Sequence, residues 1–343
     1  MRASNIELLR IIAMAFVVLL HCNFASLGYP STASLNIDAP KEITKMFFEN
    51  ICIISVNCFI LINGFFSIRL SLQRLMRFCL HCLLYGLLIY VGALLLGLER
   101  FTFGMFVNKS LLWWLRDNWF ICCYLALMLF APLANILFEN TNIKQLSFRI
   151  LLLLTFDCIM GWLIGMKGNG TFGGYSVFHL LVVYCLGRFI SKVIQNKTDL
   201  FKHGGRRYLW LCAIFVLVNT VLAYIQTRWN LPIGIYAYNA PIVLLISVCF
   251  FLFFLHLDIG YNRFINFVAK SSFSVFLIHI HPTVFPLFKN SMNNLFETFG
   301  GYCYVPLTVL MALLLYGLSI FLDFAIRPIE GRIASFFPYK ELK

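Results

Sequence analysis

Arg10 and His21 lie on the first apolar segment of the chain, residues 8–27, and ten residues separate them. A segment of this length can cross a membrane, where hydrocarbon penalises charged and unpaired polar groups, so an ionisable side chain within it is a candidate functional residue. Eleven helical steps of about 100° come to three turns plus about 20°, which places both side chains on one helix face about 16 Å apart along the axis. We expect Arg10 near one membrane surface and His21 near mid-depth.

The imidazole of His21 could act as a general base, because its neutral form can take a proton from a hydroxyl group near neutral pH. The alternative is a histidine that only hydrogen-bonds a neighbouring helix. The guanidinium of Arg10 could bind a phosphate, or it could pair with Glu7 three residues earlier. An arginine at the cytoplasmic end of a first helix is also expected from membrane orientation alone.

The composition is that of an integral membrane protein. Hydrophobic residues make up 61% and charged residues 12% of the 343 residues, whereas soluble proteins contain about 45–50% and about 25%. We predict an all-α, polytopic membrane protein with a single domain over residues 1–343 and no extra soluble domain. About ten transmembrane helices are expected, at residues 8–27, 47–66, 76–98, 119–138, 149–166, 175–194, 208–226, 238–257, 271–290 and 303–324.

The basic residues predict how these segments are oriented, because Lys and Arg in short loops are retained on the cytoplasmic side. With ten spans, 19 of the 27 basic residues fall on the side of the two termini and 8 on the other. Both termini are therefore predicted to be cytoplasmic. This distribution also accounts for the net charge of +13 without a nucleic-acid partner, since the charge is spread over many loops.

Asp157 and His279 are further candidates inside the apolar segments. A carboxylate at the depth of Asp157 needs a partner or a proton, and it could pair with His21 or a lysine. His279 lies close to Pro282, which should kink or end the ninth helix and free backbone groups that could line a cavity. For the remaining span histidines we expect packing roles with satisfied hydrogen bonds: His81, His179 and His256.

Two further sets of residues could contact a substrate. Asn57 and Asn63 are six residues apart on the second segment, and both could donate hydrogen bonds to a carbonyl or a sugar. Trp113, Trp114 and Trp119 gather just before the fourth segment. Tryptophan prefers the membrane interface, which explains them simply. A platform that stacks on an acceptor sugar is the alternative.

Twelve cysteines do not indicate a metal site. Most of them fall within apolar segments, where they act as small apolar side chains. Cys79 and Cys82 have the spacing of a metal-binding pair, but no second pair lies in the neighbouring sequence. Helix packing is the expected role, and no metal is predicted.

Several stretches of the chain come in a recognisable order. The arginine, ten residues and histidine of residues 10–21 are followed by Val56–Phe66, Asn118–Leu127, Tyr184–Arg188 and Ser274–His279. Together they resemble the acyltransferase-3 family of bacterial membrane proteins, and the resemblance covers nearly the whole chain. Asn63 stands where the family usually has serine.

The resemblance implies a membrane-bound O-acyltransferase in the cytoplasmic membrane of a bacterium. Such proteins move an acyl group, usually acetyl from acetyl-CoA, to a sugar hydroxyl of a surface polysaccharide, lipopolysaccharide or related glycan. The donor would be a cytoplasmic acyl-CoA, with no bound cofactor, and the acceptor a glycan or lipid-linked oligosaccharide. His21 would be the general base, Arg10 would lie near the phosphates or pantetheine arm of the donor, and His279 would contact substrate.

Arg69, Arg74 and Arg77 lie in the short loop after the second segment. Guanidinium groups bind phosphate bidentately, so this loop is the expected dock for the donor phosphates. The alternative is the orientation rule for basic residues.

The rival function is a membrane transporter of a glycan or lipid-linked sugar. It would also have about ten spans and buried polar groups, but the chain has no pair of matching Gly/Pro-interrupted segments that would indicate inverted repeats. A non-enzymatic scaffold would not need His21, Asp157 and His279. Neither the oligomeric state nor the choice between acetyl and another acyl group is indicated by the sequence.

Overall fold

The structure is a computed structural model that describes residues 3–164, 172–196, 204–299 and 304–336. Within these ranges it is built from helices, and it contains no β-strand. The expectation of an all-α membrane protein is therefore confirmed.

Most neighbouring helices of the described residues are joined by a few residues, and residues 230–240 between α12 and α13 form a longer connection. They are α1 (Ser4–Cys22), α2 (Phe24–Leu27), α3 (Thr32–Ile37), α4 (Ala39–Cys52), α5 (Ser55–Phe66), α6 (Leu72–Leu95), α7 (Phe103–Phe106), η1 (Val107–Leu112), α8 (Trp113–Arg116), α9 (Trp119–Glu139), α10 (Ile143–Asp157), η2 (Cys158–Leu163), η3 (Phe172–Gly174), α11 (Val177–Gln195), α12 (Gly205–Trp229), α13 (Pro241–Leu255), α14 (Arg263–Val268), η5 (Ala269–Ser271), α15 (Ser272–His279), α16 (Val284–Phe299) and α17 (Tyr304–Ser335).

Each of the ten expected apolar segments falls on helices of the described chain. Eight candidate spans are long and apolar enough to cross a membrane by themselves. The eighth expected segment corresponds to the shorter helix α13, and the ninth to the bent pair 263–279 and 284–299. The total of ten crossings stays a prediction.

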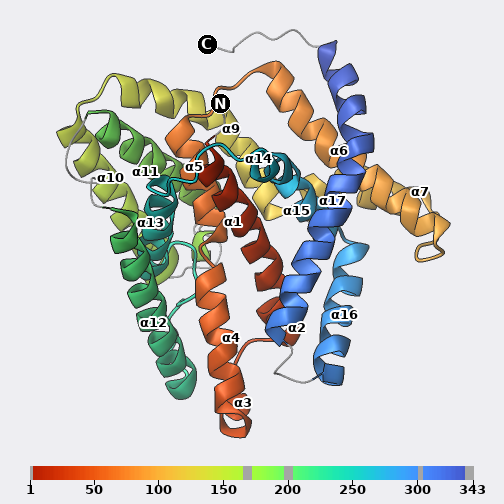
Figure 1. Ribbon diagram of the computed structural model, residues 1–343, viewed down its shortest axis with the longest axis horizontal. Helices are drawn as coiled ribbons and strands as arrows, with labels where there is room; N and C mark the ends of the chain where they lie inside the picture. Colours follow the sequence, from red (N-terminus) through yellow and green to blue (C-terminus); the bar gives the residue numbers. More distant parts are fainter. Residues whose placement is uncertain (1–2, 165–171, 197–203, 300–303, 337–343) are drawn as a thin grey trace.

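Both ends of the described chain lie at one end of the molecule. In Figure 1 the first turn of α1 and the last turn of α17 are both near the top of the view. This placement agrees with an even number of crossings. The cytoplasmic assignment of that side stays a prediction from the basic residues.

α1 occupies the middle of the helix assembly (Figure 1). It packs against α4, α5, α13, α15 and α17. Its residues Leu9, Ala13 and Val18 are completely buried in the apolar core. α1 is therefore held on several sides by other helices, while Arg10 and His21 are only partly buried.

Polar side chains cap the helices that surround α1. The side chain of Ser71 accepts a hydrogen bond from the backbone N–H of Arg74 at the start of α6, at 3.3 Å. Asn118 caps α9 in the same way, and Ser176 caps α11 through the N–H of His179. Such caps satisfy N–H groups that a helix leaves free in its first turn.

Gly64 of α5 and Gly187 of α11 let these two helices touch at the backbone. A Cβ on Gly64 would lie 2.2 Å from the carbonyl oxygen of Tyr184, and one on Gly187 would lie 2.5 Å from that of Leu61. Small residues allow this close approach of helices in membranes. The crossing fixes α5, whose other residues face the interior next to α1.

The ninth apolar segment is broken where the sequence predicts it. α15 ends at His279 and α16 begins at Val284, and the chain bends by 89° between the two helical parts. His281 lies in the break, where its Nε2–H donates to the carbonyl of Lys109 at 2.8 Å and its Nδ1 accepts from the N–H of Thr283 at 3.2 Å. The bond to Lys109 attaches the segment between α15 and α16 to η1. The helix ends just before Pro282, as the sequence predicts.

Candidate active site

Arg10 and His21 line one cavity of about 350 Å³, as their spacing on α1 predicts. Its walls come from α1, α5, α6, α9 and the segment from η5 to α15. Most of the lining is apolar, with Phe59, Phe120 and Phe276 among the rings. A reaction in this cavity would therefore be partly shielded from water.

His21 and His279 form a hydrogen-bonded pair beside this cavity. The Nδ1 of His21 lies 2.8 Å from the Nε2 of His279, and the Nδ1 of His279 lies 2.6 Å from the carbonyl oxygen of Val275. His279 is completely buried, whereas His21 is partly accessible from the cavity. The sequence named both histidines but did not pair them.

The carbonyl of Val275 sets the proton positions in the neutral pair. A carbonyl oxygen only accepts hydrogen bonds, so the Nδ1 of His279 carries a hydrogen and its Nε2 has the lone pair. The Nδ1 of His21 must then donate to that lone pair. This leaves the Nε2 of His21 without a hydrogen, and within the described residues it has no other hydrogen-bond partner. A histidine in this tautomer can accept a proton from a bound hydroxyl group.

The break in the ninth segment supplies both the partner of His21 and its packing. α15 contributes His279 in its last turn, and α16 contributes Phe285 and Phe288 directly after the bend. The ring of Phe285 meets His21 edge-on with centroids 5.4 Å apart, and Phe288 lies 5.9 Å from His279. These rings restrict the orientation of both imidazoles.

Arg10 connects the histidine cavity with a second cavity of about 640 Å³. Arg10, Asn63 and Tyr124 line both, and Arg69 and Arg74 line the second. The structure thus places two of the three predicted phosphate-binding arginines in the cavity that adjoins the histidine cavity at Arg10. Arg10 also forms the expected ion pair with Glu7, at 3.7 Å.

Arg77 lies away from Arg69 and Arg74. It lines a separate cavity of about 430 Å³ together with Lys270, Arg327 and Glu330. Both Arg74 and Arg77 lie on α6, where residues three positions apart are neighbours on the helix surface. The side chain of Arg74, however, turns back and donates to the carbonyl of Arg69 at 2.6 Å. The three arginines therefore do not form one dock.

The comparison with protein families gives one match. The model of the acyltransferase-3 family, described as an acyltransferase domain, matches residues 4–324. The chain belongs to this family. No curated protein and no solved structure matches it. Membership supports a membrane acyltransferase activity for this chain.

In this acyltransferase-3 protein, the stretches that carry the family resemblance come together in space. Asn63 and Gly64 lie between the cavity and the crossing with α11, where Tyr184 and Gly187 are found. Asn63 points its amide group at the carbonyl of Phe59, at 2.9 Å, while its oxygen is 3.5 Å from the hydroxyl of Tyr124. Asn63 therefore has one side in the cavity, as a substrate-binding role requires.

Asn57 does not line this cavity, although it lies on the same helix. It is buried, and its amide group donates to the carbonyl of Tyr238 at 2.9 Å while its oxygen accepts from the Nε2 of His179, also at 2.9 Å. The two residues are six positions apart, about 600° of helical rotation, so their side chains point about 120° apart and Asn57 faces His179 of α11. Direct substrate binding by Asn57 is not supported by this position.

Asp157 pairs with His179, and neither His21 nor a lysine is its partner. Its Oδ2 lies 2.7 Å from the Nδ1 of His179, and both side chains are completely buried. Asn239 donates to the other carboxylate oxygen at 3.3 Å. Asp157 cannot reach His21 because the end of α10 packs against α11, and α1 is not among the main neighbours of α10. His179 thus has the packing role that we expected for it.

Trp113 and Trp114 are buried and do not form a platform. Trp113 is 1% and Trp114 is 5% exposed. Trp113 packs on Gly86 of α6, where a Cβ would lie 2.4 Å from its Nε1, and on the ring of His281. Trp119 alone of the three lines the histidine cavity. The interaction with a sugar that we considered for all three is supported only for Trp119.

The sequence interpretation missed Glu49 and Tyr238. Tyr238 lines the histidine cavity, and burial, Tyr175 and the Glu49 carboxylate raise the pKa of Tyr238 well above its usual value. Glu49 is buried on α4 at the level where α1 ends. An acidic residue within the second apolar segment was the available signal for Glu49, whereas nothing in the loop before α13 distinguished Tyr238.

No metal site is evident in the described parts of the chain, where no three His, Cys, Asp or Glu side chains gather at one point. The site consists of protein groups that can move a proton, bind phosphate and stack on a ring. Arginines lie at one end of it, the histidine pair in the middle, and aromatic residues beside the histidines.

Proposed function

We propose that this protein transfers an acyl group, acetyl in the simplest case, from acyl-CoA to a hydroxyl group of a glycan or lipid-linked oligosaccharide. The hydrogen bond between His21 and His279 carries the proposal, because it leaves the Nε2 of His21 as a free base on a residue that lines the cavity. The cytoplasmic membrane of a bacterium and a surface polysaccharide or lipopolysaccharide acceptor belong to the same proposal.

The reaction needs one proton transfer through His21. Its Nε2 takes the proton of the sugar hydroxyl while the oxygen attacks the thioester carbonyl of the donor. The carbon–sulfur bond breaks, the new ester bond forms, and the imidazolium returns the proton to the departing thiolate. His279 stabilises the transient positive charge by accepting the Nδ1–H of His21. No co-reactant is needed.

The donor approaches from the side of Arg69 and Arg74. Phosphate groups pair well with guanidinium groups, and the cavity beside these arginines shares Arg10, Asn63 and Tyr124 with the lining of the histidine cavity. In this arrangement the pantetheine arm passes Arg10 and carries the thioester to His21.

The test is donor turnover by the purified, full-length protein. We expect labelled acetyl-CoA to release free CoA when a glycan acceptor is present, with the label appearing on the glycan. A protein that moves labelled sugar across proteoliposome membranes but never cleaves acetyl-CoA would be a transporter, and that result would refute the proposal.

A further inference from the structure

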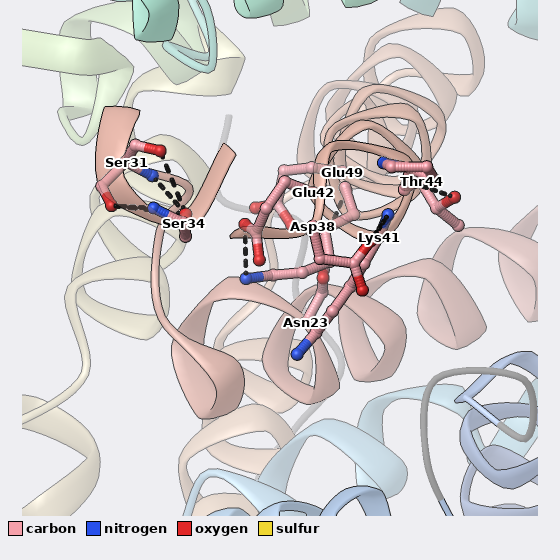
Figure 2. A network of polar contacts seen from close by, with 10 residues as sticks. Asn23, Ser31, Ser34, Asp38, Lys41, Glu42, Thr44 and Glu49 are labelled. Carbon is pink, nitrogen blue, oxygen red and sulfur yellow. Dashed lines mark hydrogen bonds and ion pairs between the residues drawn. The ribbon is translucent and has the colours of Figure 1, made fainter. Parts of the chain in front are cut away.

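A cluster of aromatic and hydroxyl-bearing side chains surrounds Glu49 at the end of α1 that carries His21. Glu49 is 6% exposed and accepts a hydrogen bond from the side chain of Asn23, at 2.8 Å. Asn23 follows directly after α1, two residues beyond His21. Figure 2 shows Asn23 beside α4, with Glu49 and Glu42 projecting from that helix. The carboxyl group therefore lies close to the end of the catalytic helix.

The carboxyl group of Glu49 contributes to the raised pKa of four tyrosines, namely Tyr29, Tyr175, Tyr236 and Tyr238. Burial, Glu49 and Tyr29 raise the pKa of Tyr236, and burial, Tyr29 and Glu49 raise the pKa of Tyr175 to about 12. The same carboxyl group contributes to the raised pKa of Tyr238. The rings also link this cluster to the end of α1, because Tyr236 meets Phe24, the residue after Asn23, with ring centroids 5.1 Å apart.

The aromatic rings of this cluster are continuous with the histidine cavity. The rings of Trp119 and Tyr175 meet with centroids 4.6 Å apart, and Tyr175 lies 5.1 Å from Tyr238. Trp119 and Tyr238 also line the cavity that His21 lines. Tyr175 is 50% exposed and Tyr29 is 71% exposed, so the cluster reaches from the cavity to the molecular surface.

Two buried polar atoms of the cluster have no partner among the described residues. They are the side-chain oxygen of Asn23 and the hydroxyl group of Tyr236. An unpaired buried polar atom costs free energy unless a ligand or water satisfies it. A ligand with several hydroxyl groups would supply the missing hydrogen bonds.

We propose that Glu49 and the rings of Trp119, Tyr175, Tyr236 and Tyr238 form a sugar-binding subsite that holds the acceptor next to His21. Glu49 accepts hydrogen bonds from sugar hydroxyls, the tyrosine hydroxyls exchange hydrogen bonds with others, and Trp119 packs on an apolar face of the sugar ring. The inference rests on the proposed acyl transfer, and it names the acceptor side of the same site.

Binding is measured first without donor, on the full-length protein in detergent. The probes are neutral trisaccharides of glucose, galactose and mannose, observed by saturation-transfer NMR. We expect at least one of them to bind the wild-type protein, Glu49→Gln to weaken that binding about tenfold, and Tyr175→Phe to weaken it about threefold, as the loss of one hydrogen bond predicts. Absence of binding to the wild-type protein would overturn the subsite.

Two matched variants serve as controls. Glu42→Gln changes an equally buried carboxyl group on the same helix, which pairs with Lys45 at 3.0 Å. Tyr261→Phe changes an exposed tyrosine elsewhere. Both are expected to bind the trisaccharide like the wild type. If Glu49→Gln protein does not fold, the Tyr175→Phe variant provides the test, because Tyr175 is partly exposed. Trisaccharide affinity of Tyr175→Phe protein equal to that of the wild type would overturn the subsite.

Turnover of acetyl-CoA with the same trisaccharide separates the two proposals. We expect Glu49→Gln and Tyr175→Phe to raise the KM for the acceptor and to leave the KM for acetyl-CoA unchanged. An unchanged acceptor KM in both variants would overturn the subsite and leave acyl transfer intact. Trisaccharide binding that depends on Glu49, without any release of CoA, would overturn the acyl transfer and leave the subsite intact.

Discussion

His21 and His279 lie 258 residues apart in the chain and share one hydrogen bond in the folded protein. The backbone carbonyl of Val275 determines the tautomer of His279, and His279 in turn determines that of His21. A buried group that fixes the tautomer of a catalytic histidine is worth several orders of magnitude in rate in serine proteases. We therefore propose that His279 positions His21 and does not itself contact substrate, since it is not among the residues that line the histidine cavity.

Replacing His279 by leucine should lower kcat by on the order of 100-fold or more, because His21 loses the acceptor that orients its basic nitrogen. The KM for acetyl-CoA should stay the same. His256→Leu is a matched control, since His256 also donates from Nδ1 to the carbonyl four residues earlier, at 2.8 Å, but lines none of the described cavities. Steady-state kinetics of the two variants provide the measurement, and equal rates for both would rule out the positioning role.

Sequence reasoning found the reactive residues better than it found their partners. The spacing of Arg10 and His21 predicted their common face, because helix geometry is local. The pairing of Asp157 with His179, by contrast, depends on which helices become neighbours. Spacing within one helix carries no information about that choice.

Two elements position the site: the crossing of α5 with α11, and the loop that joins α5 to α6. The crossing depends on Gly64 and Gly187, whose backbones touch those of the opposite helix. The loop presents Arg69 and Arg74 to the cavity that leads to Arg10. α5 thus connects the packing of the helices with the proposed donor site.

Gly64→Ala should destabilise the protein by about 1–3 kcal/mol, because the new methyl group forces the two helices apart. Gly92→Ala is the control, since a Cβ there meets no atom within 4 Å. Thermal unfolding of both variants in detergent gives the comparison. A midpoint for Gly64→Ala equal to that of Gly92→Ala would show that the helices do not approach as described.

Replacing both Arg69 and Arg74 by glutamine should raise the KM for acetyl-CoA on the order of tenfold, because charge-assisted hydrogen bonds to phosphate are lost. Arg77→Gln should change it much less, since Arg77 lines a different cavity. Steady-state kinetics at two salt concentrations measure the effect, and the wild-type KM should rise with salt. An effect of Arg77→Gln as large as that of the double variant would restore the single dock that the sequence suggested.

At the scale of the whole molecule, hydropathy predicted the helical segments well, because burial in lipid imposes long apolar runs. It did not predict that α15 and α16 meet at 89°, although Pro282 marked the place. The direction of such a bend depends on contacts with distant elements, here the bond from His281 to Lys109 of η1.

The distribution of basic residues predicts the orientation of the whole chain. Alkaline phosphatase fused after Gly97 should be active, and the same enzyme fused after Asp258 should be inactive, because it folds only outside the cytoplasm and eight spans return the chain to the inside. Activity assays of the two fusions in intact cells test this. Activity of the second fusion would contradict the ten-span arrangement with cytoplasmic termini.

The most direct test of the proposed chemistry is the rate of acetyl transfer by His21→Ala protein. The variant should fold, bind acetyl-CoA with the affinity of the wild type, and lose a factor of about 100 to 10,000 in kcat, as expected for removal of a general base. A folded His21→Ala protein that transfers acetyl groups at the wild-type rate would contradict the assignment of His21 as the base.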